Sequence, residues 1–203
     1  MNKAFVIGLT GPTGAGKGVV GELLKEKGFA VIDADRVARS VTEKGSETLT
    51  AIAAAFGDDI IKDGELDRPL LAFRAFSDKE STQKLNSITH PAILKAVKDA
   101  IESLTQSGKT KIILDAPQLF EAGAQGICDF IVSVLATRET RISRIIERDG
   151  ITREGAIRRI SAQKRDDFFI ENSDFVIYND SDFCALNRQT DELMLRLKSL
   201  GAI

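Results

Sequence analysis

The pattern of apolar positions divides the chain into short apolar runs separated by longer amphipathic stretches. Five runs have the length and apolar content of buried strands: Ala4–Thr10, Ala30–Asp33, Lys111–Asp115, Phe130–Leu135 and Phe175–Tyr178. Helical patterns lie between them, and this alternation is typical of a parallel sheet with helices on both faces. We therefore predict an α/β fold with a five-stranded parallel sheet. Ligands of such folds bind at the carboxyl ends of the strands.

Two longer segments interrupt the alternation. Residues 36–110 read as almost wholly helical, and residues 138–172 follow the fourth expected strand. Turn-forming residues predict breaks in the first segment at Gly45-Ser46, Gly57-Asp58, Lys62-Asp63-Gly64 and His90-Pro91. Pro69 and Ser77-Asp78 suit helix starts. Residues 182–200 read as a closing helix whose apolar positions include Leu186, Leu193, Leu195 and Leu197.

A glycine-rich loop follows the first expected strand. Residues 11–18 read Gly-Pro-Thr-Gly-Ala-Gly-Lys-Gly, and a helical stretch, Val19–Lys27, comes directly after. The glycines let the backbone direct several N–H groups at one anion, the helix N-terminus adds positive potential, and Lys17 can reach the outer phosphates. The loop therefore predicts a phosphate-binding site of the P-loop NTPase type, in which residues 12–19 bind ATP.

The loop departs from the usual motif at its end. Gly18 and Val19 stand where a serine or threonine hydroxyl normally contacts Mg²⁺. Either the metal is held through water and other carboxylates, or the site has lost catalysis. Asp115 ends an apolar run, so its carboxylate is a candidate to hold a water of the Mg²⁺ shell. The alternative is that Asp115 caps the next element.

Two carboxylates stand at the end of the second expected strand. Asp33 is positioned to face a bound γ-phosphate, where it could orient an attacking hydroxyl and accept its proton. The alternative is that Asp33 or Asp35 caps the following helix, Arg36–Val41, and capping suits Asp35 better.

Residues 138–165 are strongly basic, with eight arginines and one lysine against four acidic residues. Arg141, Arg144 and Arg148 share one helix face. Guanidinium groups stabilise the charge of a transferring phosphoryl group, so we expect Arg144 and Arg148 to bind ATP and Arg148 to take part in catalysis. Arg138 and Arg153 are expected on the surface. A solvated, salt-bridged helix is the alternative for the whole segment.

Residues further along suggest an acceptor pocket. His90 precedes a proline, which predicts a helix entrance and an acceptor contact rather than a catalytic base. Leu119 and Phe120 could pack on an adenine or pantetheine-like surface, or could belong to the core. Glu121 could bind a hydroxyl or a basic residue of the 138–172 segment.

Composition excludes several classes of protein. A formal net charge of −2 argues against a nucleic-acid-binding surface, and a single histidine excludes a multi-histidine metal site. Cys128 and Cys184 have no metal-ligand spacing and form no disulfide framework, which favours the cytoplasm. No apolar run approaches the roughly 18–20 residues of a membrane span, and no signal peptide is expected.

The residues in order resemble the dephospho-CoA kinase family along almost the whole chain. The matching positions are Ile7-Gly8-Leu9-Thr10-Gly11, Val31-Ile32-Asp33-Ala34-Asp35, Ala38-Arg39, Phe56-Gly57, Asp63-Gly64-Glu65-Leu66-Asp67-Arg68, Phe76, Leu85-Asn86, His90-Pro91, Pro117-Gln118-Leu119-Phe120-Glu121, Arg148-Asp149-Gly150, Gln163, Asp174-Phe175-Val176-Ile177 and Asn179. The resemblance implies transfer of the γ-phosphoryl group of ATP to the ribose 3′-hydroxyl of dephospho-CoA, which gives CoA and ADP.

The resemblance also implies residue roles. Asp33 matches the catalytic base, Lys17 the phosphate-loop lysine and Arg148 the lid arginine. The expected acceptor-binding residues are Asp33, Asp35, Arg39, His90, Pro117, Leu119, Phe120 and Glu121. The implied cofactors are ATP and Mg²⁺, and the partners are small-molecule substrates, without nucleic acid or membrane, for a monomer or weak homo-oligomer.

We therefore expect a single P-loop kinase domain over residues 1–203. Its core is residues 1–35, 111–137 and 173–203, residues 36–110 form a helical acceptor-binding insertion, and residues 138–172 form a basic lid. Three features depart from the family pattern: the loop ends in Gly18, Arg141 stands where glutamine is common, and Gln118 stands where leucine is usual. The alternatives are a kinase of another small metabolite or nucleoside monophosphate, and a nucleotide-binding module without catalysis.

Overall fold

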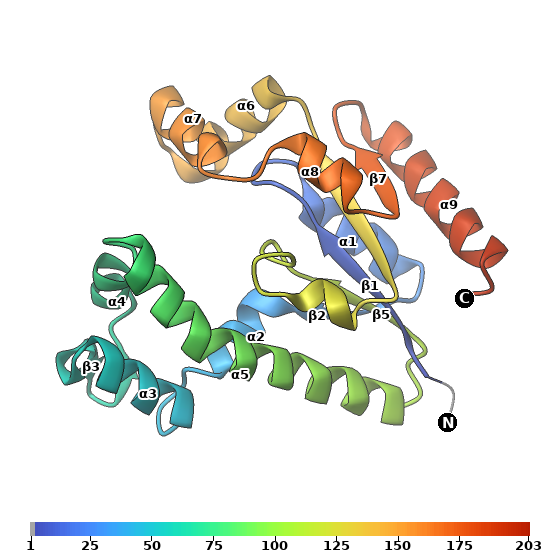
Figure 1. Ribbon diagram of the computed structural model, residues 1–203. Helices are drawn as coiled ribbons and strands as arrows, with labels where there is room; N and C mark the ends of the chain where they lie inside the picture. Colours follow the sequence, from blue (N-terminus) through green and yellow to red (C-terminus); the bar gives the residue numbers. More distant parts are fainter. Residues whose placement is uncertain (1–2) are drawn as a thin grey trace. The chain divides into compact units, whose positions relative to one another are not determined.

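A five-stranded parallel sheet forms the centre of the fold in the computed structural model, which describes residues 3–203. The strands lie in the order β2-β5-β1-β6-β7 (Figure 1). Their bounds are β1 Phe5–Thr10, β2 Ala30–Asp33, β5 Lys111–Asp115, β6 Phe130–Leu135 and β7 Phe175–Tyr178. The predicted fold class is confirmed, and so are all five strands, the first beginning one residue later than expected.

The chain divides into two compact units. The first, here called the sheet unit, comprises Met1–Ile32 and Leu104–Ile203. The second, the helical unit, is Asp33–Ser103 and contains most of the expected insertion. The sheet unit contains α1 Lys17–Glu26, the short 3₁₀ helix η2 Ala124–Ile127, α6 Arg138–Asp149, α7 Arg153–Ser161, α8 Asp166–Glu171 and α9 Phe183–Ser199.

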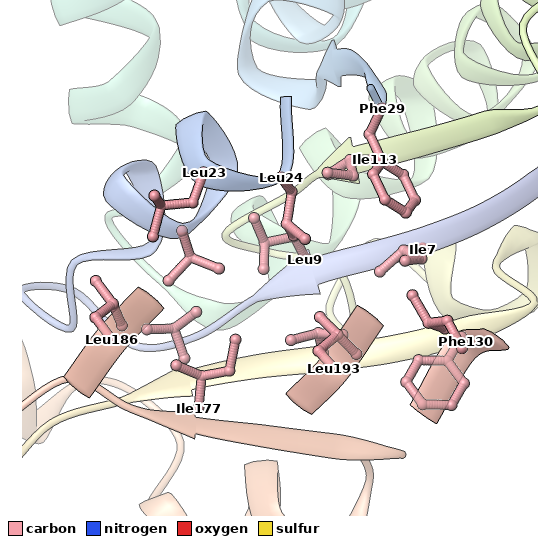
Figure 2. Packing of buried hydrophobic residues seen from close by; sticks show 14 of the residues in the cluster. Ile7, Leu9, Leu23, Leu24, Phe29, Ile113, Phe130, Ile177, Leu186 and Leu193 are labelled. Carbon is pink, nitrogen blue, oxygen red and sulfur yellow. The ribbon is translucent and has the colours of Figure 1, made fainter. Parts of the chain in front are cut away.

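One face of the sheet packs against α1 and α9, as Figure 2 shows. Ile7 and Leu9 of β1 lie in one buried cluster with Leu24 of α1, and Leu186 and Leu193 of α9 complete the same cluster. Leu197 is also buried, whereas Leu195, on the opposite side of α9, is 66% exposed. Each fully buried Leu or Ile contributes about 1.5–3 kcal/mol through removal from water. This cluster therefore fixes α1, and with it the loop that precedes α1.

The other face of the sheet is covered by the segment that follows β5. Gly8 of β1 shows how closely this segment packs, because a Cβ added there would lie 2.8 Å from Cys128 Sγ and 2.9 Å from Leu119 Cδ2. Ser133 of β6 lies on the same face and shares a 2.6 Å hydrogen bond with Ser173, just after α8. Helices thus lie on both faces, as predicted.

The helical unit has its own small core. It contains α2 Ala34–Ser40, α3 Glu47–Phe56, the short 3₁₀ helix η1 Asp58–Ile60, α4 Arg68–Ala75 and most of α5 Lys79–Gln106. Ile52, Ile60 and Leu71 are buried together. Pro69 lies in the first turn of α4, and Asp78 accepts a 2.7 Å hydrogen bond from the Ser81 N–H group at the start of α5, so both predicted helix starts are confirmed.

The prediction of an almost wholly helical insertion is wrong at residues 61–66. A hairpin of β3 Ile61–Lys62 and β4 Glu65–Leu66 lies there. Asp63 and Gly64 both have positive φ angles, 55° and 83°, which defines a two-residue turn of the type that suits β-hairpins. The strands are too short for an alternating pattern, so the Asp-Gly pair was the one available signal.

The predicted break at His90-Pro91 is also wrong. Helix α5 runs without interruption through Pro91, so His90 lies inside a helix rather than at its entrance. Proline removes one backbone hydrogen bond and disfavours helical geometry at the residue before it. Leu85 and Ile88 pack against the core of the helical unit on one side of Pro91, and Val97 is buried on the other. This tertiary packing outweighs the local preference.

Helices α6 and α7, in the segment that is expected to form the lid and is called the lid below, form a third cluster. Ile142 and Ile145 of α6 pack against Ala156 of α7, and all three are buried. Over residues 3–203, the structure holds no helix that is long and apolar enough to cross a bilayer.

Candidate active site

The loop between β1 and α1 has the conformation that its glycines predict. Gly14 and Gly16 have φ angles of 79° and 88°, which side-chain-bearing residues rarely adopt, and Gly16 is the N-cap of α1. A Cβ added at Gly14 would lie 2.8 Å from the Arg141 carbonyl oxygen. The loop therefore turns tightly against the lid and ends at a helix N-terminus, the usual setting for a bound phosphate.

A cavity of about 760 Å³ opens over this loop. Loop residues form one side and residues of the lid the other, with Pro117 from the segment after β5. Its lining residues are Gly11, Pro12, Thr13, Gly14, Gly16, Lys17, Gly18, Pro117, Arg144, Glu147, Arg148, Arg159 and Gln163. Of the predicted ATP-binding residues, Ala15 is buried behind the loop and Val19 is exposed on α1, so these two lie outside the lining.

Lys17 and Asp115 form an ion pair. They meet because β1 and β5 are parallel neighbours, with Leu9 opposite Asp115, so the loop after β1 passes the carboxyl end of β5. Both side chains are largely buried, at 15% and 22% exposure. The predicted phosphate-loop lysine and the predicted metal carboxylate therefore lie in direct contact.

Arg144 and Asn179 hold the loop from behind. Arg144 Nη1 donates to the carbonyl oxygens of Gly14 and Ala15, at 3.4 and 3.3 Å, and its Nη2 donates to the Asn179 carbonyl at 3.0 Å. Asn179 Nδ2 donates to the Ala15 carbonyl at 2.9 Å and is buried. Arg144 therefore contacts the loop as well as lining the cavity.

Arg148 reaches the cavity from the last turn of α6. Its guanidinium group makes two hydrogen bonds to Asp149, of 2.7 and 2.9 Å, and Arg159 of α7 pairs with the same carboxylate. The hydrogen bonds from Arg148, together with both positive charges, hold the pKa of Asp149 below its usual range. Asp149 is thus an anion that keeps two arginines beside the cavity: Arg148, which was predicted, and Arg159, which was not.

Arg141 differs from its neighbours on α6, because it is buried at 3% exposure. It contacts the loop and the α7–α8 connection instead of solvent. Arg141 is therefore buried, although it shares a helix face with Arg144 and Arg148. Arg138 and Arg153 are exposed, as predicted.

Asp33 ends β2 and is the N-cap of α2. Its Oδ1 accepts a 3.0 Å hydrogen bond from the Arg36 N–H group. Capping was expected of Asp35, which instead lies exposed in the first turn of α2. Arg39 is exposed in the last turn of the same helix. One bond leaves a carboxylate with further acceptor capacity, so capping and a catalytic role are compatible.

His90 is half-buried within α5. Burial lowers the pKa of its imidazole, so the ring is neutral near pH 7 and presents one donor and one acceptor nitrogen.

The residues after β5 that were expected to bind the acceptor lie in different environments. Pro117 lines the cavity, whereas Leu119 is fully buried in the core. Phe120 packs edge-on against Phe168 of α8, with 5.0 Å between the ring centroids. Gln118 and Glu121 are exposed. Core packing, one of the two roles expected for Leu119, is the one found.

Sequence reasoning missed several lining residues. Glu147 and Arg159 line the cavity and were not singled out, whereas Gln163, which also lines it, was noted only through the resemblance. Arg159 follows Arg158 directly, and the direction of α7 alone decides which of the two faces the cavity.

A parallel sheet, a glycine loop at a helix N-terminus and a lid rich in arginine define a P-loop nucleotide-binding protein with the architecture of small-molecule kinases. A family model described as dephospho-CoA kinase matches residues 5–184. The chain therefore belongs to the dephospho-CoA kinase family.

Individual relatives agree with this assignment. A dephospho-CoA kinase of Corynebacterium glutamicum is 38% identical over 194 residues, which is 95% of this chain and 97% of that protein. One from Listeria monocytogenes is 41% identical over 174 residues, 85% of this chain and 87% of the relative. Among solved structures, TT1252 from Thermus thermophilus superimposes with a TM-score of 0.81 at 28% identity and covers 96% of this chain and 98% of its own.

Proposed function

We propose that this chain transfers the γ-phosphoryl group of ATP to the 3′-hydroxyl of the ribose in dephospho-CoA and so forms CoA and ADP. The observation that carries the proposal is the cavity in which the glycine loop and Lys17 meet three lid arginines, in a chain of the dephospho-CoA kinase family. This arrangement suits a triphosphate, because loop N–H groups, an ammonium group and guanidinium groups converge on one volume.

Asp33 is proposed as the general base. A carboxylate in hydrogen-bond reach of the acceptor hydroxyl takes its proton as the oxygen attacks the γ-phosphorus. The Arg36 N–H group fixes the rotamer of Asp33, since its bond to Oδ1 holds the carboxylate at the start of α2. Asp35, Arg39, His90, Pro117, Leu119, Phe120 and Glu121 are proposed to surround the acceptor. Because Leu119 is fully buried, its part is to shape the pocket wall.

Lys17 and Arg148 are proposed to stabilise the charge of the transferring phosphoryl group. Lys17 binds Asp115, and phosphate oxygens compete with that carboxylate for its ammonium group. Arg148 is 59% exposed and bound to Asp149, so its side chain can move to the phosphates while Arg159 retains the aspartate. Both cations then exchange one anionic partner for another, so that neither is left without a counter-charge.

The residues fit a Mg²⁺ ion that is held mainly by ATP and water. Mg²⁺ usually keeps several waters and binds one or two carboxylates together with substrate phosphates. Asp115 offers one carboxylate beside the loop, whereas Gly18 offers no side-chain oxygen. Across residues 3–203, no three His, Cys, Asp or Glu side chains gather into a metal site. We propose that Asp115 binds the ion through water; when bound, Mg²⁺ neutralises charge on the β- and γ-phosphates.

We also propose a cytoplasmic protein that is monomeric or weakly self-associating and acts without nucleic acid or membrane. Cys128 and Cys184 are both free thiols, in agreement with a reducing compartment. Light scattering after gel filtration measures the mass in solution.

An acceptor assay tests the proposed function. The protein is incubated with ATP, Mg²⁺ and dephospho-CoA, AMP or shikimate, ADP release is followed, and ³¹P NMR locates the new phosphate. We expect dephospho-CoA to be the fastest acceptor, with the phosphate on the ribose 3′-oxygen. The Lys17→Met variant, which keeps the fold-determining glycines, gives the background rate. Faster turnover of AMP or shikimate would assign another kinase activity, and ATP binding without any turnover would indicate a non-catalytic module.

A further inference from the structure

Arg141 makes an unusual set of contacts for a lid arginine. Its side chain is 4% exposed, and its guanidinium group points in three directions. Nε donates to the Thr13 carbonyl at 2.9 Å, Nη1 to Asp166 Oδ1 at 3.0 Å and Nη2 to Gln163 Oε1 at 3.3 Å. These bonds connect α6 to the phosphate loop, to the α7–α8 connection and to α8.

Thr13 is held at both ends. The Thr13 N–H group donates to Gln163 Oε1 at 2.9 Å, while its carbonyl accepts from Arg141. Because Arg141 also binds Gln163 Oε1, the three residues form a closed set of bonds. We call this set the Arg141 clamp: Arg141, Gln163 and the backbone of Thr13.

The clamp determines where the next amide group points. The Thr13 carbonyl and the Gly14 N–H group belong to one planar trans peptide, so they point in opposite directions. Arg141 holds the carbonyl from behind the loop, and Gly14 lines the cavity in front of it. Arg144 likewise donates to the Gly14 and Ala15 carbonyls, and Asn179 donates to the Ala15 carbonyl. Three consecutive carbonyls are thus held by side chains, and the Ala15 N–H group donates to the Pro12 carbonyl at 3.2 Å, so the Gly14 N–H group is the one that this arrangement directs at the cavity.

The chemistry of the guanidinium group suits this role. Its planar fork donates in several fixed directions, which the single ammonium group of lysine cannot do. Burial lowers the pKa of Arg141, but Asp166 opposes the change and arginine stays charged. A buried ion pair is weak evidence for stability, since an apolar residue of similar volume is often as stable. The contacts of Arg141 are better explained by orientation of the loop.

We propose that Arg141 is a positioning residue for nucleotide binding, which acts through Thr13 to direct the Gly14 amide at the phosphates. The inference deepens the proposed function and rests on it only for the identity of the nucleotide. Arg141 itself does not contact the reacting atoms. Its loss should therefore weaken binding of a phosphate-bearing ligand and leave the chemical step nearly intact.

The test compares Arg141→Met with Arg138→Met. Methionine keeps most of the buried volume at position 141 but donates no hydrogen bond, whereas Arg138 is an exposed arginine of the same helix, one turn away. Calorimetry measures the dissociation constants for ATP and adenosine, and NMR measures hydrogen exchange of the Thr13 and Gly14 amides. We expect Arg141→Met to weaken ATP binding about tenfold or more, the scale of a lost charge-assisted bond, with little change for adenosine and with faster amide exchange. Arg138→Met should resemble the natural protein in all three measurements.

Further variants keep the proposal testable if Arg141→Met does not fold. Arg141→Lys retains the charge but not the planar fork of donors. Gln163→Leu changes an exposed residue and removes the acceptor of the Thr13 N–H group. We expect both to weaken ATP binding more than adenosine binding, and their effects not to add, because both act through Thr13. Equal losses for ATP and adenosine, or unchanged binding and exchange in Arg141→Met and Arg141→Lys, would overturn the proposal.

Kinetics separate this inference from the proposed function. With dephospho-CoA as acceptor, Arg141→Met should raise the KM for ATP by about the same factor as the dissociation constant while kcat changes by about threefold or less. A natural protein that binds ATP but does not phosphorylate dephospho-CoA would refute the proposed function. The binding and exchange measurements would still decide the role of Arg141.

Discussion

At the scale of single residues, Asp33 shows how one carboxylate serves structure and chemistry together. The helix-capping bond to the Arg36 N–H group sets its rotamer, and the position at the end of β2 makes it the proposed base. Asparagine caps helices about as well as aspartate but does not accept a proton. The two roles can therefore be separated by one substitution.

We expect Asp33→Asn to lower kcat by about 10²-fold or more, the usual contribution of a positioned general base. The melting temperature and the dissociation constant for ATP should stay close to those of the natural protein, because the cap remains and the phosphate loop is untouched. Steady-state kinetics, calorimetry and thermal unfolding measure the three quantities. Asp182→Asn, at the exposed N-cap of α9, is the matched control, because it makes the same change at a helix cap outside the site. Turnover that survives in Asp33→Asn would remove Asp33 from the mechanism.

Gly18 offers a direct test of how the metal is held. Within residues 3–203, no atom apart from its chain neighbours and the nearby backbone of its own helix lies within 4 Å of a Cβ added there, and Gly18 is the second residue of α1. A serine should therefore fit, and its hydroxyl would stand where other P-loops contact Mg²⁺. We expect Gly18→Ser to reduce the Mg²⁺ concentration needed for half-maximal activity and to raise stability by about 0.5 kcal/mol.

Gly18→Ala supplies the control, because alanine improves helix formation by about 1 kcal/mol without adding an oxygen ligand. Titration of Mg²⁺ in both variants separates the two effects. The same Mg²⁺ requirement in Gly18→Ser and Gly18→Ala would show that the hydroxyl does not reach the metal.

Residue-level prediction worked where a local rule fixes the conformation. The tight turn at Gly14 and Gly16 could be predicted because the order of strand, glycine-rich loop and helix leaves few backbone conformations there. Arg141 could not, because spacing on a helix shows which residues share a face but not whether that face meets water or another loop. The ion pair of Lys17 with Asp115 depends on which strands are neighbours, and that is a property of the whole sheet.

At the scale of elements, strands with continuous apolar runs were predicted with their bounds almost unchanged, since burial on both faces leaves a strong compositional signal. The β3–β4 hairpin was not predicted, because two-residue strands carry no such signal. The continuity of α5 through Pro91 was not predicted, for the opposite reason. Its local signal at His90-Pro91 pointed to a break, and packing of Leu85, Ile88 and Val97 overrode it.

Keeping Pro91 inside α5 should lower the free energy of unfolding by a measurable amount. Pro91 is exposed inside α5, where it donates no hydrogen bond to the Ser87 carbonyl. We expect Pro91→Ala to raise the free energy of unfolding by about 1–2 kcal/mol, because the helical preference of alanine outweighs the greater freedom of the unfolded chain. Urea denaturation measures the change.

Pro69 is the matched control, since it lies in the first turn of α4 where its ring suits the backbone. We expect Pro69→Ala to be neutral or to destabilise by up to about 1 kcal/mol. Destabilisation by Pro91→Ala would mean that α5 is shaped by the proline and not merely tolerant of it.

At the scale of the whole molecule, the net charge of −2 conceals a strongly uneven distribution. Lys17, Arg144, Arg148 and Arg159 line a cavity that contains one acidic residue, Glu147. A polyanion that binds there stabilises the folded chain by mass action, by about 2.7 kcal/mol at a hundred times its dissociation constant. For a chain of this length, each 1 kcal/mol raises the melting temperature by roughly 2–4 °C.

We therefore expect saturating ATP to raise the melting temperature by about 5–10 °C, as measured by differential scanning calorimetry. Adenosine should produce a much smaller shift, because the cations and loop amides bind phosphate. In Lys17→Met the shift caused by ATP should largely disappear, whatever the melting temperature of the variant alone, while Lys25→Met, an exposed substitution on the same helix, should keep it. Equal protection by adenosine and ATP would place the nucleotide affinity in base contacts and leave the phosphate loop without its proposed role.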